Sequence, residues 1–154
     1  MLELRDYQSD DLEELLLLFY HTVHHINIHD YSIEQCDAWA DGNADRNAWN
    51  STLISHHTLV AVEQGMIVGF GDMDDSGYLD HLYVHKAYQG KGIATMLCDA
   101  LELACKSNFY LTHASITARP FFSSRGYYVV CEQVVQRHGI WLTNYKMKKA
   151  RNSS

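Results

Sequence analysis

Apolar positions along the chain change their spacing several times, and each change predicts a new element. The N-terminal run, residues 2–7, has the composition of a short strand. Apolar residues then recur three and four positions apart, which predicts helices over residues 9–23, 32–39 and 45–54. Ser9 or Asp10 is expected to cap the first of these helices, and Ser32 the second.

The middle of the chain alternates between β-rich runs and short turn signals. Gln64-Gly65 separates the runs 58–62 and 66–72, a pattern typical of a hairpin. A polar turn at 74–77 then leads into a third run, residues 78–84. We therefore expect an antiparallel meander of three strands.

The C-terminal half mixes both periodicities. The patterns predict a helix over 92–106, a strand over 110–114, a short helix over 117–124, and a strand pair, 127–135 and 140–148, joined around His138-Gly139. At 154 residues, the chain suits one domain with a sizeable core. We expect this domain to span residues 1–150 and residues 151–154 to form a disordered tail.

The junction between the third strand and the next helix is the most informative segment. A helix that begins there leaves its first N–H groups without partners and places partial positive charge at the same end. Gly90 and Gly92 lack a Cβ, so an anion such as a pyrophosphate can approach the main chain closely. An ordinary strand–helix turn is the alternative. The segment lacks the Gly-Lys-Ser/Thr of a P-loop and the third glycine of a dinucleotide fingerprint.

The motif Gln89-x-x-Gly92-x-Ala94, between a Leu-x-Val strand and an amphipathic helix, resembles the acetyl-coenzyme A (acetyl-CoA) signature of the Gcn5-related N-acetyltransferase (GNAT) superfamily. Residues 118–127 resemble its Ala-x-x-Phe-Tyr-x-x-x-Gly-Phe segment, and the order of elements matches over nearly the whole chain. Asp80 and the segments 115–118 and 143–145 resemble a bacterial subgroup of largely unassigned substrate.

The resemblance implies an α+β fold in α/β/α layers. Its central sheet is mixed, mostly antiparallel, with six to seven strands and flanking helices. A bulged, splayed strand pair forms the acetyl-CoA cleft. The implied cofactor-binding residues are the strand backbone of Leu82, Tyr83 and Val84, the turn residues Gln89, Gly90, Lys91, Gly92, Ile93, Ala94 and Thr95, and Phe122. The N–H of Tyr83 or Leu82 is expected to face the thioester oxygen.

A general base is expected on the same strand. Tyr78 and Asp80 are two positions apart and therefore project from one face, which would line the acetyl-accepting cleft. Asp80 is the candidate base, and a substrate-orienting or structural role is the alternative reading. The alternation of side chains places His81 on the opposite face.

A general acid is harder to identify. Many members of the superfamily use a tyrosine beside the coenzyme sulfur, whereas Phe122 occupies that position here and cannot donate a proton. Tyr145, Ser115, Ser123 or water are the candidates. Tyr145 is therefore the second catalytic candidate beside Asp80.

The charge balance narrows the partners. A formal net charge of −7 argues against binding to nucleic acid or to an anionic membrane surface and favours a cationic acceptor. The chain has no run of about 18 apolar residues and no signal-peptide pattern, which favours a cytoplasmic protein. Its four cysteines lack metal or redox spacing and are expected to be reduced and mostly buried.

The sequence thus favours an N-acetyltransferase that transfers acetyl from acetyl-CoA to a primary amine of a small molecule or peptide. The reaction would be direct attack in a ternary complex, without a metal, and a homodimer is compatible with the superfamily. A catalytically silent coenzyme A-binding sensor or assembly module is the alternative. A metal-binding protein is a third hypothesis, because His21, His24 and His25 have helical spacing with His29 nearby.

Overall fold

The computed structural model describes residues 1–151, so the predicted tail lies outside the described residues except for Arg151. The strands are β1 (Glu3–Asp6), β2 (His57–Glu63), β3 (Met66–Met73), β4 (Tyr78–Val84), β5 (Phe109–Ser115), β6 (Tyr128–Arg137) and β7 (Ile140–Ala150). The α-helices are α1 (Leu12–His25), α2 (Ile33–Trp39), α3 (Arg46–Ser55), α4 (Ile93–Ala104) and α5 (Arg119–Ser124). Short 3-10 turns are η1 (Ser9–Asp11), η2 (Asn27–His29) and η3 (Lys86–Tyr88). Within residues 1–151, no helix has the length and apolar character needed to cross a membrane.

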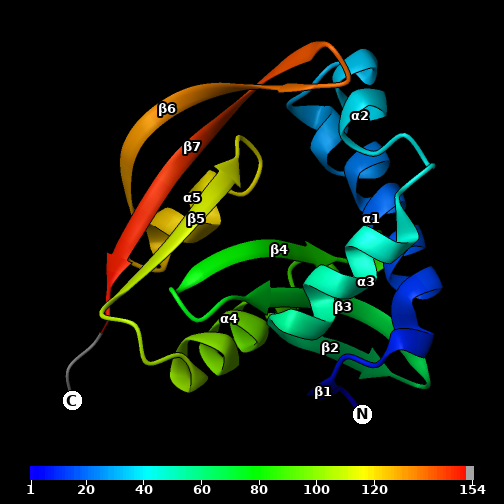
Figure 1. Cartoon of the computed structure of the whole chain (residues 1–154), viewed down its shortest axis with the longest axis vertical. Coiled ribbons are helices and arrows are strands. Elements are labelled where there is room, and N and C mark those ends of the chain that lie inside the picture. The colour runs from blue at the N-terminus through cyan, green and yellow to red at the C-terminus, as the bar shows by residue number, and fades with distance from the viewer. Residues whose placement is uncertain (152–154) are drawn as a thin grey trace.

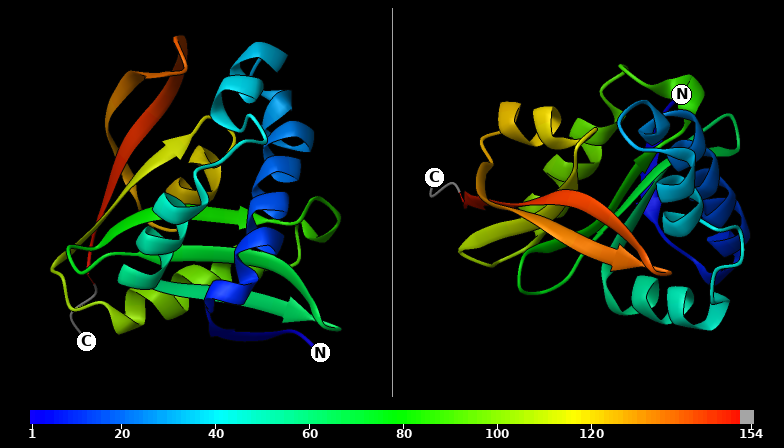
Figure 2. Two further views of the ribbon diagram at one scale, coloured as in Figure 1. Left: turned by 45° about the vertical axis from the view of Figure 1, so that its right-hand side comes forward. Right: turned by 90° about the horizontal axis from the view of Figure 1, so that it is seen from above.

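The strands form one mixed sheet of seven strands in the order β1-β2-β3-β4-β5-β7-β6. Only β4 and β5 are parallel among the described pairs. Helix α4 packs on one face of β2 and β3, and α1 and α3 pack on the other (Figures 1 and 2). Each side has its own apolar core. The predicted layered α+β fold is confirmed.

Helix starts follow local capping signals in two of the three N-terminal helices. The Ser32 hydroxyl accepts a hydrogen bond from Gln35 N, and the Gln35 side chain accepts one from Ser32 N, as in a capping box. Asp45 caps α3. The predicted caps of α1 are wrong, because Ser9 and Asp10 lie in the preceding turn η1 and α1 begins after it.

The two predicted hairpins are present. Gln64 and Gly65 both have positive φ, 52° and 77°, and so do His138 and Gly139, 46° and 78°. Two successive left-handed residues match the twist of an antiparallel strand pair. These turns therefore fix the β2–β3 and β6–β7 hairpins.

The centre of the sheet is irregular where β4 begins. Asp72 pairs with His81 and Met73 with Leu79, so Asp80 is an extra residue in β4, which is a β-bulge. Strand β5 pairs with β4 only at Tyr78 and Leu79, after which the two strands diverge (Figure 1). The bulge and the splayed strand pair implied by the GNAT resemblance are both present.

The β6–β7 hairpin arches from the far edge of the sheet to α2 (Figures 1 and 2). The Tyr31 hydroxyl donates to Thr143 O at 2.7 Å and accepts from Ile116 N at 2.9 Å. The Gln35 side chain donates to Trp141 O at 3.0 Å. These bonds attach the hairpin to the helical side of the molecule, across the opening between β4 and β5.

Candidate active site

The turn before α4 has the geometry of an anion site. Gly92 is the N-cap of α4 with φ of 81°, and no side chain within residues 1–151 caps the helix. The first helical bond is from Met96 N to Gly92 O, so the N–H groups of Ile93, Ala94 and Thr95 have no partner within the helix. A Cβ placed on Gly90 or Gly92 would meet no atom within 4 Å. The turn is therefore open to a ligand.

A cavity of 460 Å³ runs from this turn along β4 into the opening beside β5. Ten of the eleven predicted cofactor-binding residues line it: Leu82, Tyr83, Val84, Gln89, Gly90, Gly92, Ile93, Ala94, Thr95 and Phe122. Lys91 is the exception, and its ammonium group lies over the Tyr88 ring at 5.1 Å from the centroid. The structure thus brings residues from β4, the turn, α4 and α5 to one cavity.

The free backbone groups of β4 follow from its pairing with β3. His85 N donates to Val68 O, and hydrogen-bonding direction alternates along an antiparallel strand. The backbone N–H and C=O groups of Tyr83 therefore point towards β3, while those of Leu82 and Val84 point into the opening towards β5. Of the two predicted donors to a thioester oxygen, the geometry favours Leu82 N–H.

Gln89 has a role that the motif alone does not reveal. Its side-chain amide donates to Val84 O at 2.7 Å, and the Thr22 hydroxyl donates to the same carbonyl at 3.2 Å. These bonds tie the turn and α1 to the end of β4. Gln89 therefore fixes the position of the turn relative to the strand.

A second cavity, of 240 Å³, adjoins the first. Residues that line both cavities include Trp39, Asp80, His81, Tyr83, His113 and Ser115. Tyr78 lines the second cavity. Asp80 therefore stands where the two cavities meet.

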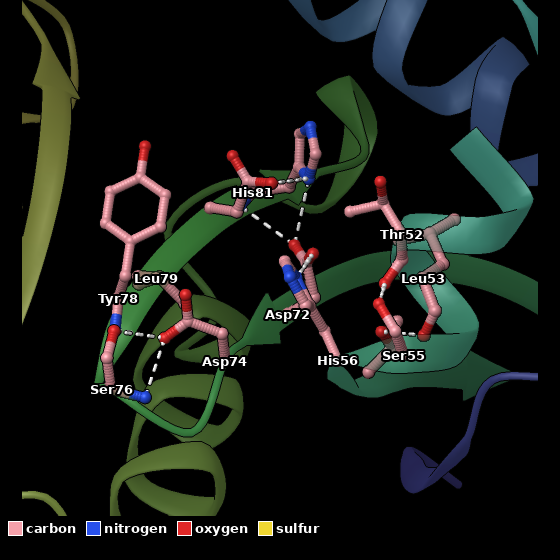
Figure 3. A network of polar contacts seen from close by, with 12 residues as sticks. Thr52, Leu53, Ser55, His56, Asp72, Asp74, Ser76, Tyr78, Leu79 and His81 are labelled. Carbon is pink, nitrogen blue, oxygen red and sulfur yellow. Dashed lines mark hydrogen bonds and ion pairs between the residues drawn. The ribbon is translucent and has the colours of Figure 1, made fainter. Parts of the chain in front are cut away.

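His81 also lines both cavities, so its predicted position on the opposite face is wrong. The bulge at Asp80 shifts the alternation by one residue, and Tyr78 and His81 consequently project from the same side of β4 (Figure 3). The imidazole stacks on Trp49 at 4.6 Å between ring centroids. His81 is thus a second titratable group at the junction of the cavities.

Asp72 holds His81 in place. Its carboxylate is fully buried and accepts from His81 Nδ1 at 2.9 Å, from His81 N at 2.9 Å and from His56 Nδ1 at 2.8 Å (Figure 3). Because both Nδ1 atoms donate, a neutral His81 carries its lone pair on Nε2. The free nitrogen of His81 can therefore act as a base.

Burial and hydrogen bonding oppose one another in this group. Burial alone would raise the pKa of Asp72, but hydrogen bonds from His56 and His81 outweigh it and lower that pKa. Burial would lower the pKa of His81, but the bond to Asp72 and its charge raise it overall. The Asp72 hydrogen bond also raises the pKa of His56 against a smaller effect of burial. The three groups therefore favour imidazolium next to carboxylate.

The cluster of His56, Asp72 and Asp80 is better explained by hydrogen bonding than by metal binding. His56, Asp72 and Asp80 offer ligand atoms within 4.8 Å of one another, but the imidazoles already bind both Asp72 oxygens. The histidines of α1 do not converge. His24 Nε2 lies 2.8 Å from Ala40 O, and His25 Nδ1 lies 2.8 Å from His21 O.

The candidates for the general acid separate clearly. Tyr145 lines neither cavity among the described residues, and the guanidinium of Arg119 lies 4.4 Å from its ring centroid. Ser123 is exposed on α5 and also lies outside both cavities. Ser115 lines both, and its hydroxyl accepts from Ala118 N at 3.0 Å. The structure therefore does not bring Tyr145 to the cleft with Asp80.

Several cleft residues were not predicted from the sequence. Thr117 lines the first cavity with a buried hydroxyl that has no partner within residues 1–151, and Asn144 lines the second with a buried Oδ1 in the same condition. Asp72 and His56, which bind one another beside His81 but line neither cavity, were also not predicted. One signal was available for Asp72, a carboxylate in the otherwise apolar run 66–73.

A mixed sheet that opens beside an anion-binding helix start defines a class of acyl-transferring proteins, and comparison with known families agrees. Residues 27–149 match a family model described as an acetyltransferase (GNAT) domain. The chain belongs to the GNAT family and is an acetyltransferase.

Individual relatives support the assignment. A protein of Escherichia coli K12 named "Uncharacterized N-acetyltransferase YafP" is 34% identical over 148 residues, 96% of this chain and 95% of that protein. A GCN5-related N-acetyltransferase from Rhodopseudomonas palustris superposes with a TM-score of 0.92 at 34% identity, covering 96% and 94% of the two chains. PaiA N-acetyltransferase from Thermoplasma acidophilum, in complex with coenzyme A, gives 0.80 at 17% identity, covering 97% and 99%, and shows the shared fold.

Proposed function

We propose that this acetyltransferase transfers the acetyl group of acetyl-CoA to a primary amine of a small molecule or peptide, by direct attack in a ternary complex. The observation that carries the proposal is the meeting of two cavities at Asp80 and His81. One cavity begins at the anion-binding turn, and the other approaches the same two side chains from the helical side. A donor and an acceptor can therefore bind at the same time.

The residues present fit coenzyme A. The unpartnered N–H groups at the start of α4 suit a pyrophosphate, and the glycine turn leaves it room. The edge of β4 that faces β5 suits an extended pantetheine arm, which would pair with the backbone of Leu82 and with the N–H of Val84 like an added strand. The Thermoplasma neighbour is described in complex with coenzyme A, which favours the same ligand here.

His81 is proposed as the general base. Acetyl-CoA supplies an acetyl group activated as a thioester, and the amine must lose a proton to attack it. Imidazole is the side chain whose ordinary pKa lies nearest neutral pH, and the free Nε2 of His81 lines both cavities, so His81 is the better base. Asp72 orients the ring, and Asp80 binds the ammonium form of the acceptor.

Two further needs are met by the chain itself. Leu82 N–H is a free donor in the opening and would stabilise negative charge on an oxygen placed there. The leaving thiolate needs little protonation in the transition state, because a thiol has a pKa of about 8.5. No cysteine among the described residues lines the two cavities, which favours direct attack over a covalent enzyme intermediate.

Calorimetric titration with acetyl-CoA tests the donor site. Gly92→Glu should weaken binding at least about 100-fold, because a side chain and a negative charge would occupy the pyrophosphate position. Gly65→Glu is the matched control, since Gly65 has a similar φ of 77° and equally open space but lies in the β2–β3 turn. If both variants bind acetyl-CoA equally well, the donor site is assigned wrongly. Binding without acetylation of any amine would instead favour the silent coenzyme A-binding module.

A further inference from the structure

The acceptor cavity is small and walled by aromatic rings. Its volume of 240 Å³ lies below the roughly 300–1,000 Å³ usual for ligand pockets. The rings come from α1, α2, α3, β4 and the loop before α2: Phe19, Tyr31, Trp39, Trp49, Tyr78 and Tyr83. This size favours a free small molecule over a peptide or a long polyamine.

Both charge signs are present in the wall. Asp80 contributes a carboxylate from the bulge of β4, and Arg137 contributes a guanidinium from the end of β6. The Arg137 side chain donates to Gln136 O at 3.1 Å. No carboxylate within residues 1–151 forms an ion pair with it. Its positive charge is therefore available to an anion in the cavity.

The charges of Asp80 and Arg137 both influence the pKa values of Tyr78 and His113. Tyr78 and His113 lie 5.2 Å apart between centroids. Burial, followed by Asp80, raises the pKa of Tyr78 to about 12, and Arg137 opposes that rise. Burial lowers the pKa of His113, Lys146 and Arg137 lower it further, and Asp80 opposes them. Asp80 and Arg137 thus both lie near one part of the wall.

Asn144 adds an open acceptor. Its Oδ1 is buried, lines the cavity and accepts no hydrogen bond from residues 1–151. A buried carbonyl oxygen without a donor is costly, so a bound ligand with an N–H group would relieve that cost. An ammonium group supplies such a donor.

We propose that the acceptor is a small zwitterionic amine of the free amino acid class, whose ammonium group binds near Asp80, His81 and Asn144 and whose carboxylate pairs with Arg137. This inference rests on the acetyl transfer proposed above and specifies its acceptor. It differs from the cationic acceptor that the net charge of −7 favours, because the cavity wall includes the Arg137 guanidinium as well as the Asp80 carboxylate. The surface charge and the cavity charge are separate properties of the molecule.

The test compares three forms of one acceptor body: phenylalanine, phenylalaninamide and phenethylamine, with the same three forms of leucine as a second series. Acetylation is followed by release of free coenzyme A thiol and by mass of the product. We expect kcat/KM for the amino acid to exceed that of its amide at least about tenfold, because only the acid offers Arg137 a carboxylate.

Variants of Arg137 then test whether this side chain causes the preference for the amino acid over its amide. Arg137→Gln should reduce the ratio of acid to amide to about one, and Arg137→Lys should retain part of it, since the charge remains but the fork of donors is lost. Arg46→Gln is the matched control. Arg46 binds Glu13 on the helical surface and does not line the acceptor cavity, so the ratio should remain. Thermal melts establish that each variant is folded.

Each outcome has a distinct meaning. Equal kcat/KM for acid and amide, or a ratio that Arg137→Gln leaves intact, overturns the amino acid assignment while acetylation of the amines retains the proposed function. Acetylation of spermidine but of none of the six compounds likewise overturns the assignment and points to a cationic acceptor. Failure to bind acetyl-CoA overturns the proposed function itself.

Discussion

Asp72 and Glu102 are both buried carboxylates, but their partners differ. Asp72 lies on β3 between two imidazoles, and one of these faces the cleft (Figure 3). Glu102 lies on α4 and accepts from Arg125 at 3.1 Å, Lys149 at 2.9 Å and the Tyr127 hydroxyl at 2.8 Å. The Asp72 cluster contains imidazoles, whose ordinary pKa lies near neutral pH, whereas the Glu102 cluster pairs a carboxylate with an arginine and a lysine.

The Glu102 cluster is suited to holding elements together. Burial would raise the pKa of Glu102, but hydrogen bonds from Arg125, Lys149 and Tyr127 outweigh it and lower that pKa. The ordinary pKa values of arginine and lysine lie well above neutral pH, so both side chains are charged there. The cluster joins α4 to β7 and to the segment after α5, and it lines neither cavity of the cleft.

This comparison separates chemistry from stability. A buried carboxylate paired with permanent cations fixes a structure, whereas one paired with histidines near a cleft can orient a group that gains and loses protons. Substitutions in the Asp72 cluster should therefore change turnover and its pH dependence. Substitution of Glu102 should lower the free energy of unfolding.

The largest expected effect is on turnover. His81→Gln should lower kcat/KM by about 10²–10⁴-fold, the usual contribution of a general base, while acetyl-CoA affinity and melting temperature change little. Steady-state kinetics with an acceptor of the wild-type enzyme measure this. His56→Gln is the control, because His56 binds the same carboxylate but lines neither cavity. Equal losses in the two variants would contradict the role of His81 as base.

The position of His81 could not be predicted from the sequence. Strict alternation places Tyr78 and Asp80 on one face and His81 on the other. The GNAT resemblance implies a bulge but not its position, and the pairing with β3 places it at Asp80. Its orienting partner Asp72 is nine residues away, on the neighbouring strand β3 and across the turn at residues 74–77. A bulge depends on contacts between strands, so one strand's composition does not specify it.

Local signals, by contrast, predicted most of the fold. The capping box at Ser32, the turn dipeptides Gln64-Gly65 and His138-Gly139, and the glycines before α4 each act within a few residues. The open glycine turn before α4 was predictable for the same reason. The wall of the second cavity was not, because Arg137 and Asn144 reach it from a hairpin more than fifty residues after Asp80.

The next effect is on stability. Glu102→Gln should lower the free energy of unfolding by about 3 kcal/mol, because the positive charges of Arg125 and Lys149 would stay buried without full compensation. Urea denaturation followed by circular dichroism measures it. Asp99→Asn is the control, since Asp99 binds Arg125 at 2.8 Å but is 65% exposed, and its loss should cost about 1 kcal/mol or less. A Glu102 variant as stable as the control would remove the structural role of the cluster.

A smaller effect is expected when the orienting carboxylate loses its charge. Asp72→Asn should lower kcat about tenfold to 100-fold, part of the contribution of the base it positions. Asp72 raises the pKa of His81, so its neutralisation should also move the acidic limb of the kcat/KM profile to lower pH. A profile recorded from pH 5.5 to 9 measures both changes. A lower plateau with an unmoved acidic limb would leave Asp72 with a merely structural role.

The smallest effect distinguishes the clusters by pH alone. The raised pKa of His56 in the folded protein contributes stability that is present below about pH 6.5 and lost as pH rises through the folded value. Glu102 and Asp72 have lowered pKa values, so their contributions are constant above about pH 5 and lost only in acid. The difference in free energy of unfolding between the wild type and His56→Gln should therefore fall by about 1 kcal/mol or less between pH 6 and 9, because His56 is partly exposed. The difference in free energy of unfolding between the wild type and Glu102→Gln should stay constant over the same pH range. Urea denaturation at pH 6, 7, 8 and 9 tests both differences, and parallel curves for the two variants would mean that the clusters do not differ in proton exchange.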